Sequence, residues 1–69
     1  MNKYIIPICN IPNSEIYNLT INANSVSECE EKLMSKLDKY SDALEWSDFV
    51  KECDSKDVLI GEIVDIETI

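Results

Sequence analysis

The chain has 69 residues, of which fourteen are acidic and six are basic, so its formal net charge is −8 at pH 7. All six basic residues are lysine, and the chain contains neither arginine nor histidine. Binding to nucleic acid or to an anionic membrane usually requires a basic stripe, so this balance argues against both. A basic surface of another protein would instead be attracted over about 8 Å at physiological salt.

Length and composition predict one small compact domain over residues 1–69. Hydrophobic residues make up 45% of the chain, which separates it from a disordered acidic tail. Cys9, Cys29 and Cys53 are an odd number without a CxxC pair, unlike the disulfide framework of a small secreted domain. The apolar run Tyr4–Cys9 is short and contains Pro7, so it predicts neither a signal peptide nor a membrane span. These features predict a cytoplasmic protein.

The first 23 residues predict an antiparallel hairpin. Residues 3–9 are rich in β-branched side chains and predict a strand, placed at a sheet edge or bulged because Pro7 cannot donate a ladder hydrogen bond. Turn-forming residues follow, centred on Pro12 and Asn13. The second strand alternates between apolar and polar residues, as expected for a strand with one wet side. Its apolar face consists of Tyr17, Leu19, Ile21 and Ala23.

A capping box from Ser25 to Glu28 predicts a helix that begins at Ser25 and extends to about residue 40. Glu28 and Lys32 are spaced as an i,i+4 ion pair on this helix. Cys29 lies on the apolar stripe, which favours packing in the core over reactivity. The full stripe is Val26, Cys29, Leu33, Leu37 and Tyr40, widened by Met34.

The remaining chain predicts a second, shorter helix and a final strand. The helix begins at either Asp42 or Ser47, ends over residues 54–57, and has Trp46, Phe49, Val50 and Cys53 on one face. The strand covers residues 58–69, but the alternation of inward-facing and outward-facing residues shifts near Gly61. A bulge or bend there is the first interpretation, and two short strands with a tight turn is the other. One face is expected to hold Val58, Ile60, Val64 and Ile66, and the opposite face Leu59, Ile63 and Ile69.

The predicted order is therefore strand, strand, helix, short helix, strand. The expected fold is α+β, in which one long helix packs across one face of a small antiparallel sheet of about three strands.

Few residues are suited to catalysis or to metal binding. A zinc site would need four convergent ligands, but the chain has no histidine and three dispersed cysteines. Asp54 and Asp57 do not follow the twelve-residue rhythm of a calcium loop. A single glycine does not make a phosphate-binding loop, and a domain this small has little room for a catalytic cleft. We expect no enzyme activity, no cofactor and no metal.

Acidic residues dominate the second half of the chain and are the candidate binding site for a protein partner. Gathered on one side, they would steer a basic groove toward the protein and present carboxylates where phosphates would lie. The alternative is a solvated helix face and an edge strand that charge protects from aggregation. Trp46 is either an exposed interface residue among these acids or a buried residue of the hydrophobic core. The candidates are Asp42, Glu45, Trp46, Asp48, Glu52, Asp54, Asp57, Glu62, Asp65 and Glu67.

The segment Leu19-Thr20-Ile21-Asn22-Ala23-Asn24-Ser25-Val26-Ser27-Glu28-Cys29-Glu30 resembles the strand-to-helix passage of very small phage and mobile-element proteins. These include the DpnD/PcfM-like group and some anti-CRISPR proteins. The resemblance implies a compact, non-enzymatic protein that acts by binding another protein.

Two functions are compatible with these features. The first is an anti-CRISPR or other anti-defence inhibitor, which blocks a basic nucleic-acid-binding surface of a host immune effector and binds no nucleic acid itself. The second is a structural or assembly protein that forms a homodimer through its C-terminal strand.

Overall fold

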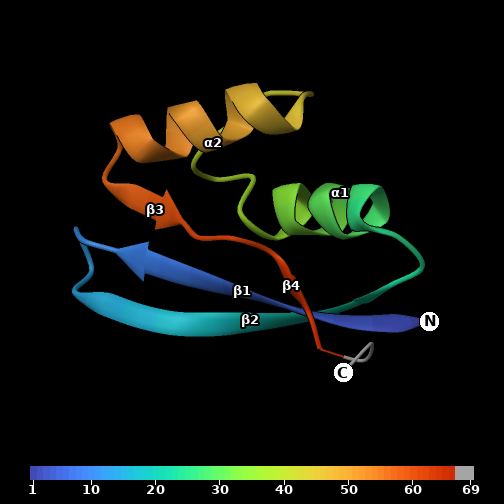
Figure 1. Ribbon diagram of the computed structural model, residues 1–69. Coiled ribbons are helices and arrows are strands. Elements are labelled where there is room, and N and C mark those ends of the chain that lie inside the picture. The colour runs from blue at the N-terminus through green and yellow to red at the C-terminus, as the bar shows by residue number, and fades with distance from the viewer. Residues whose placement is uncertain (67–69) are drawn as a thin grey trace.

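A computed structural model describes residues 1–66 of the protein as a four-stranded antiparallel sheet with two helices on one face (Figure 1). The central strand β1 has β2 along one edge, and β3 and β4 follow each other along the other edge. The predicted α+β class is confirmed, although two helices of similar length share the helix layer in place of one long helix. The elements are β1 (Asn2–Asn10), β2 (Glu15–Ala23), α1 (Val26–Lys36), α2 (Trp46–Ser55), β3 (Val58–Ile60) and β4 (Val64–Asp65).

The predicted hairpin is confirmed. β1 and β2 pair along their whole length, from Asn2 opposite Ala23 to Asn10 opposite Glu15, and a turn over residues 11–14 joins them. Alternate residues of β2 point toward the helices, with Ile21 and Ala23 fully buried. The period-two pattern of the sequence therefore identified the core face of this strand correctly.

Pro7 lies in the central strand, so its predicted position at a sheet edge is wrong. The Pro7 carbonyl accepts a hydrogen bond of 2.8 Å from the Gly61 N–H, so the Pro7 nitrogen faces the same neighbouring segment. That segment is the break between β3 and β4, where the ladder does not require a donor from Pro7. The proline is therefore tolerated because its neighbour is interrupted.

A bulge interrupts the outer strand at this point. Ile8 pairs with Ile60, whereas Ile5, three residues earlier, pairs with Val64, four residues later. The segment between β3 and β4 thus holds one residue more than β1 opposite it, which is the defining feature of a bulge. The predicted bulge at Gly61 is confirmed, and the alternative of a tight turn between two hairpin strands is wrong.

The bulge changes which side chains face the core. Val64 lies opposite Ile5 on the uncovered side of the sheet, and Ile63 packs against the core. Predicting Val64 on the face of Val58, and Ile63 on the face of Leu59, was therefore wrong, because the extra residue reverses the alternation. Ile69 lies outside the described residues.

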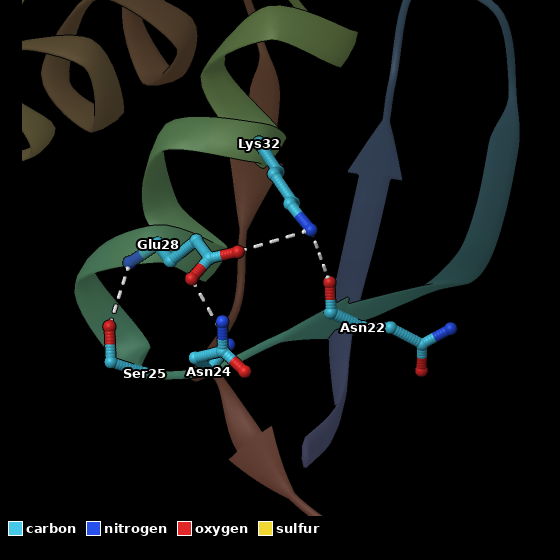
Figure 2. A network of polar contacts seen from close by, with 5 residues as sticks. All are labelled: Asn22, Asn24, Ser25, Glu28 and Lys32. Carbon is cyan, nitrogen blue, oxygen red and sulfur yellow. Dashed lines mark hydrogen bonds and ion pairs between the residues drawn. The ribbon is translucent and has the colours of Figure 1, made fainter. Parts of the chain in front are cut away.

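The N-cap at Ser25 is confirmed, but the Glu28 side chain bonds to the residue before the cap and not to the Ser25 N–H that a capping box uses (Figure 2). The Ser25 hydroxyl accepts from the Glu28 N–H at 3.2 Å, and the Glu28 carboxylate accepts from the Asn24 N–H at 3.2 Å. The same carboxylate lies 3.3 Å from the Lys32 ammonium, as the i,i+4 spacing predicted. Lys32 also donates to the Asn22 carbonyl at 2.7 Å. This network fastens the first turns of α1 to the end of β2.

Replacing Glu28 with glutamine is expected to reduce stability at neutral pH but not in acid. The Asn24 N–H, followed by the Lys32 ammonium, lowers the pKa of Glu28 below its ordinary value of 4.5. The carboxylate therefore stabilises the fold fully above pH 4.5, and this contribution is lost as the pH falls through the lowered pKa. Urea unfolding of wild type and Glu28→Gln across this range tests the prediction. The control variant Ser27→Ala, in the same turn, should show no such dependence on pH.

The first helix is shorter than predicted, ending at Lys36 and not near residue 40. Leu37 and Tyr40 nevertheless reach the core from the turn that follows. Leu37 is buried, and the Tyr40 hydroxyl accepts a hydrogen bond of 2.7 Å from the buried Asn10 side chain. Val26, predicted on the inward stripe, is instead 49% exposed at the first helical position.

The second helix begins at Trp46, with Glu45 in the N-cap position and no side-chain capping bond, so neither Asp42 nor Ser47 starts it. Three of its four predicted apolar residues face the core: Phe49 and Cys53 are fully buried and Trp46 packs against them, whereas Val50 is only half-buried. α2 packs over β3, and α1 packs over β2 (Figure 1). The buried core consists of Tyr4, Ile6, Ile8, Ile21, Ala23, Cys29, Leu33, Leu37, Phe49, Cys53 and Val58.

Candidate protein-binding surface

Four exposed carboxylates lie along one flank of α2 and on the connection that precedes it; we term Asp42, Glu45, Asp48 and Glu52 the acidic flank. Glu45, Asp48 and Glu52 are three and four residues apart, so they share one side of the helix. The Glu52 carboxylate accepts a hydrogen bond of 3.0 Å from the Ser41 hydroxyl. This bond holds the Glu52 side chain against the connection, beside the residue that precedes Asp42.

A hollow of about 290 Å³ adjoins the acidic flank, between α1 and the connection to α2. Asp42 belongs to both features, so the two form one continuous surface. Leu44, beside it, is 93% exposed, which is unusual for a leucine. We term the hollow the acidic hollow. Its lining is Glu31, Met34, Ser35, Asp38, Ser41, Asp42, Ala43 and Leu44.

None of these carboxylates forms a direct ion pair with another described residue. Within residues 1–66 the one ion pair joins Lys32 to Glu28, at the other end of α1. Two lysines nearer to the connection are directed at Tyr40 instead. Lys56 donates to the Tyr40 carbonyl, and the Lys39 ammonium lies 5.0 Å from the centre of the Tyr40 ring. Lys51 lies three residues after Asp48, and Lys56 lies four residues after Glu52, so two lysines border the acidic flank. The six acids of the flank and hollow outnumber them, and this surface therefore presents an excess of negative charge to solvent.

The structure does not bring the other predicted acids to this surface. Asp54 points to a different side of α2, because it lies two residues beyond Glu52. Asp57 precedes β3 in a left-handed conformation, with φ 61°. Glu62 is exposed at the bulge, and Asp65 is half-buried in β4. Glu67 lies outside the described residues.

Trp46 lies at the border of the core. Its ring stacks on that of Phe49, with 6.1 Å between ring centres and 15° between the planes. The side chain is half-buried and follows Glu45 of the acidic flank. Trp46 therefore contributes to the packing of α2 and leaves part of its surface beside the acids.

Sequence reasoning missed Glu31, Asp38 and Leu44. Glu31 and Asp38 are seven residues apart, the separation of two helical turns, and this spacing was a usable signal. Nothing local indicated that the connection folds back over this side of α1. The hydrogen bonds of Ser41, with Glu52 and from the Ala43 N–H, hold it there.

Two of the three cysteines, Cys29 and Cys53, show no sign of activation. Cys29 and Cys53 are fully buried, and loss of hydration raises the pKa of both thiols, which favours the unreactive protonated form. In the part of the chain that the structure describes, no group of three or more cysteine or acidic side chains is arranged to hold a metal ion. Neither described helix has the length and apolar character needed to cross a bilayer.

Comparisons of the chain with protein-family models, with curated proteins and with solved structures found no match.

Proposed function

We propose that the protein is a non-enzymatic binding module, an anti-defence inhibitor encoded by a phage or mobile element. In this proposal it acts in the host cytoplasm and covers a basic, nucleic-acid-binding groove of an immune effector of the CRISPR type. The observation that carries the proposal is the excess of exposed negative charge on the acidic flank. A patch of one sign attracts an oppositely charged groove, raises the association rate and disfavours nucleic acid itself.

The acidic hollow would give this attraction a specific contact. Its volume of about 290 Å³ lies at the lower limit for small-molecule sites, and it suits a single long side chain. Met34 and Leu44 can contact the aliphatic stem of a lysine or arginine. Glu31, Asp38 and Asp42 supply carboxylates for its charged end.

Assembly through the C-terminal strand, the other function predicted from the sequence, has less support. β3 and β4 are three and two residues long, and the bulge at Gly61 separates them. Short, bulged strands are features that limit pairing with other chains.

Capture of partners from a host lysate tests the proposal. The tagged protein is expected to retain a basic partner at about 0.1 M salt and to lose most of it at about 1 M, as the Debye length falls from about 10 Å to about 3 Å. Reversing three charges, with Glu45→Lys, Asp48→Lys and Glu52→Lys together, should weaken the captured interaction at least about tenfold. Circular dichroism should show that the variant remains folded.

The matched control carries the same change in net charge elsewhere, with Glu15→Lys, Asp54→Lys and Glu62→Lys, all at exposed positions. It should bind nearly as well as wild type. Equal loss in both variants would mean that net charge, and not the acidic flank, drives binding. Capture that is unaffected by salt and by the flank substitutions would reject the proposal.

A further inference from the structure

Both helices lie on the same side of the sheet, so the opposite side is uncovered by any described element (Figure 1). We term this side the open face. Residues that are directly opposite in an antiparallel pair share a face, and the register therefore identifies its members. Ile16, Cys9 and Leu59 form one row across three strands, and Thr20, Ile5 and Val64 form another. Pro7 and Asn18 lie between the two rows.

Six of the ten strand positions on the open face are apolar, and they adjoin one another across the strands. Ile16 is 85% exposed, Val64 is 45% exposed and Leu59 is 40% exposed. A contiguous apolar area of this kind marks an interaction surface, whereas isolated exposed apolar residues do not. At the turn end, a recess of about 330 Å³ makes the face uneven. Its lining is Cys9, Asn10, Ile11, Ser14, Glu15 and Ile16.

Few charges lie on this face, although Glu15 lines the recess at its turn end. Among the strand positions that face this way in the described sheet, Lys3 is the one charged residue, and none is acidic. The remaining polar positions, Asn18, Thr20 and Asn22, are neutral. A protein with net charge −8 thus has an apolar side and an acidic side, and the acidic flank lies on the helix layer. A strongly charged partner of either sign finds little to pair with on the open face.

We propose that the open face binds the open face of a second copy of this chain, forming a symmetric dimer of two packed sheets. A second copy offers the same nearly uncharged, apolar surface, so contact leaves few buried charges unpaired. Sheets pack about 10 Å apart, and a helix is about 10 Å across, so the two helix layers would lie roughly 30 Å apart. That separation is several Debye lengths of about 8 Å, so repulsion between the acidic sides is largely screened.

The size of the face suits a dimer of moderate affinity. Nine-residue strands are about 30 Å long, and three strands spaced about 4.8 Å apart are roughly 14 Å wide. Two such faces would bury on the order of 1,000 Å² in total, which is near the lower limit for a specific interface. The dimer is therefore expected to dissociate in the micromolar range.

Sedimentation of the full chain over about 1–200 µM tests this proposal, because a micromolar dimer changes mass within that range. Wild type is expected to move from monomer to dimer mass, and added salt should leave the dimer unchanged or strengthen it. Ile16→Glu should raise the dissociation constant at least about tenfold. Leu59→Glu, on another strand of the same row, should act in the same direction.

Leu44→Glu is the matched control, since it introduces the same charge at an equally exposed aliphatic residue on the helix side. It should leave the dimer intact. A wild-type protein that stays monomeric throughout, or a dimer that Ile16→Glu and Leu59→Glu weaken no more than Leu44→Glu, would overturn the proposal. The proposal does not rest on the inhibitor function, and a monomeric Ile16→Glu variant should still capture the basic partner.

Discussion

Replacing Phe49 with alanine is expected to leave the protein largely unfolded at room temperature. Phe49 is completely buried and lies under α2, where it packs toward the sheet and against the Trp46 ring. Removing a buried phenylalanine side chain costs about 3–5 kcal/mol. A single core in a chain of this size rarely supplies more than about 3–5 kcal/mol in total, so the loss is comparable with the whole stability.

Urea unfolding, followed by the fluorescence of Trp46 and by circular dichroism, measures this effect. The chain has one tryptophan, so the signal reports on the contact with Phe49 directly. The control Lys51→Ala changes an exposed residue of the same helix and should shift the free energy of unfolding by less than about 0.5 kcal/mol. A cooperative, near-wild-type transition in Phe49→Ala would contradict the placement of α2 on the core.

Gly61→Ala is expected to lower the free energy of unfolding by about 1–3 kcal/mol, as overpacking does. An added Cβ would lie 2.5 Å from Pro7 Cγ and 3.2 Å from the Pro7 carbonyl oxygen. The proline ring cannot rotate away, and the carbonyl accepts the hydrogen bond from Gly61. The bulge or the central strand must therefore move.

A double-mutant cycle isolates this contact. In a Pro7→Ala background the ring is gone, so Gly61→Ala should cost clearly less than it does in wild type. Glu62→Ala, at the neighbouring exposed position, should change stability by less than about 0.5 kcal/mol. Equal costs of Gly61→Ala in both backgrounds would show that the close approach to Pro7 is not the cause.

The features of the fold that sequence predicted correctly depend on local signals. The alternation over residues 17–23 and the capping bond between Ser25 and Glu28 each arise within a few residues of chain. The end of α1 is different, because Leu37 and Tyr40 keep helical spacing after the helix has stopped. The Tyr40 N–H bonds to the Leu37 carbonyl, and its hydroxyl to Asn10, thirty residues away. The local spacing is compatible with a longer helix, and the contact of Tyr40 with the distant Asn10 favours the shorter one.

The same distinction applies to the outer strand and to the binding surface. The shift in alternation near Gly61 was visible in the sequence, but the side to which Ile63 and Val64 turn depends on register against β1. Similarly, the spacing of Glu45, Asp48 and Glu52 predicts one helical flank, which the structure contains. Their continuity with Asp38 was not predictable, because a loop that folds back on α1 creates it.

Because β1 lies at the centre of the sheet, it must pair with neighbours on both sides, and the two pairings are expected to form one after the other. The partner on one side, β2, follows after a turn over residues 11–14, so this pair closes a small loop at little entropic cost. The partners on the other side, residues 58–65, are separated from β1 by about fifty positions, and such non-local pairing is slow. During synthesis, β1 is therefore expected to pair first with β2, and its other edge stays unpaired until this later segment arrives.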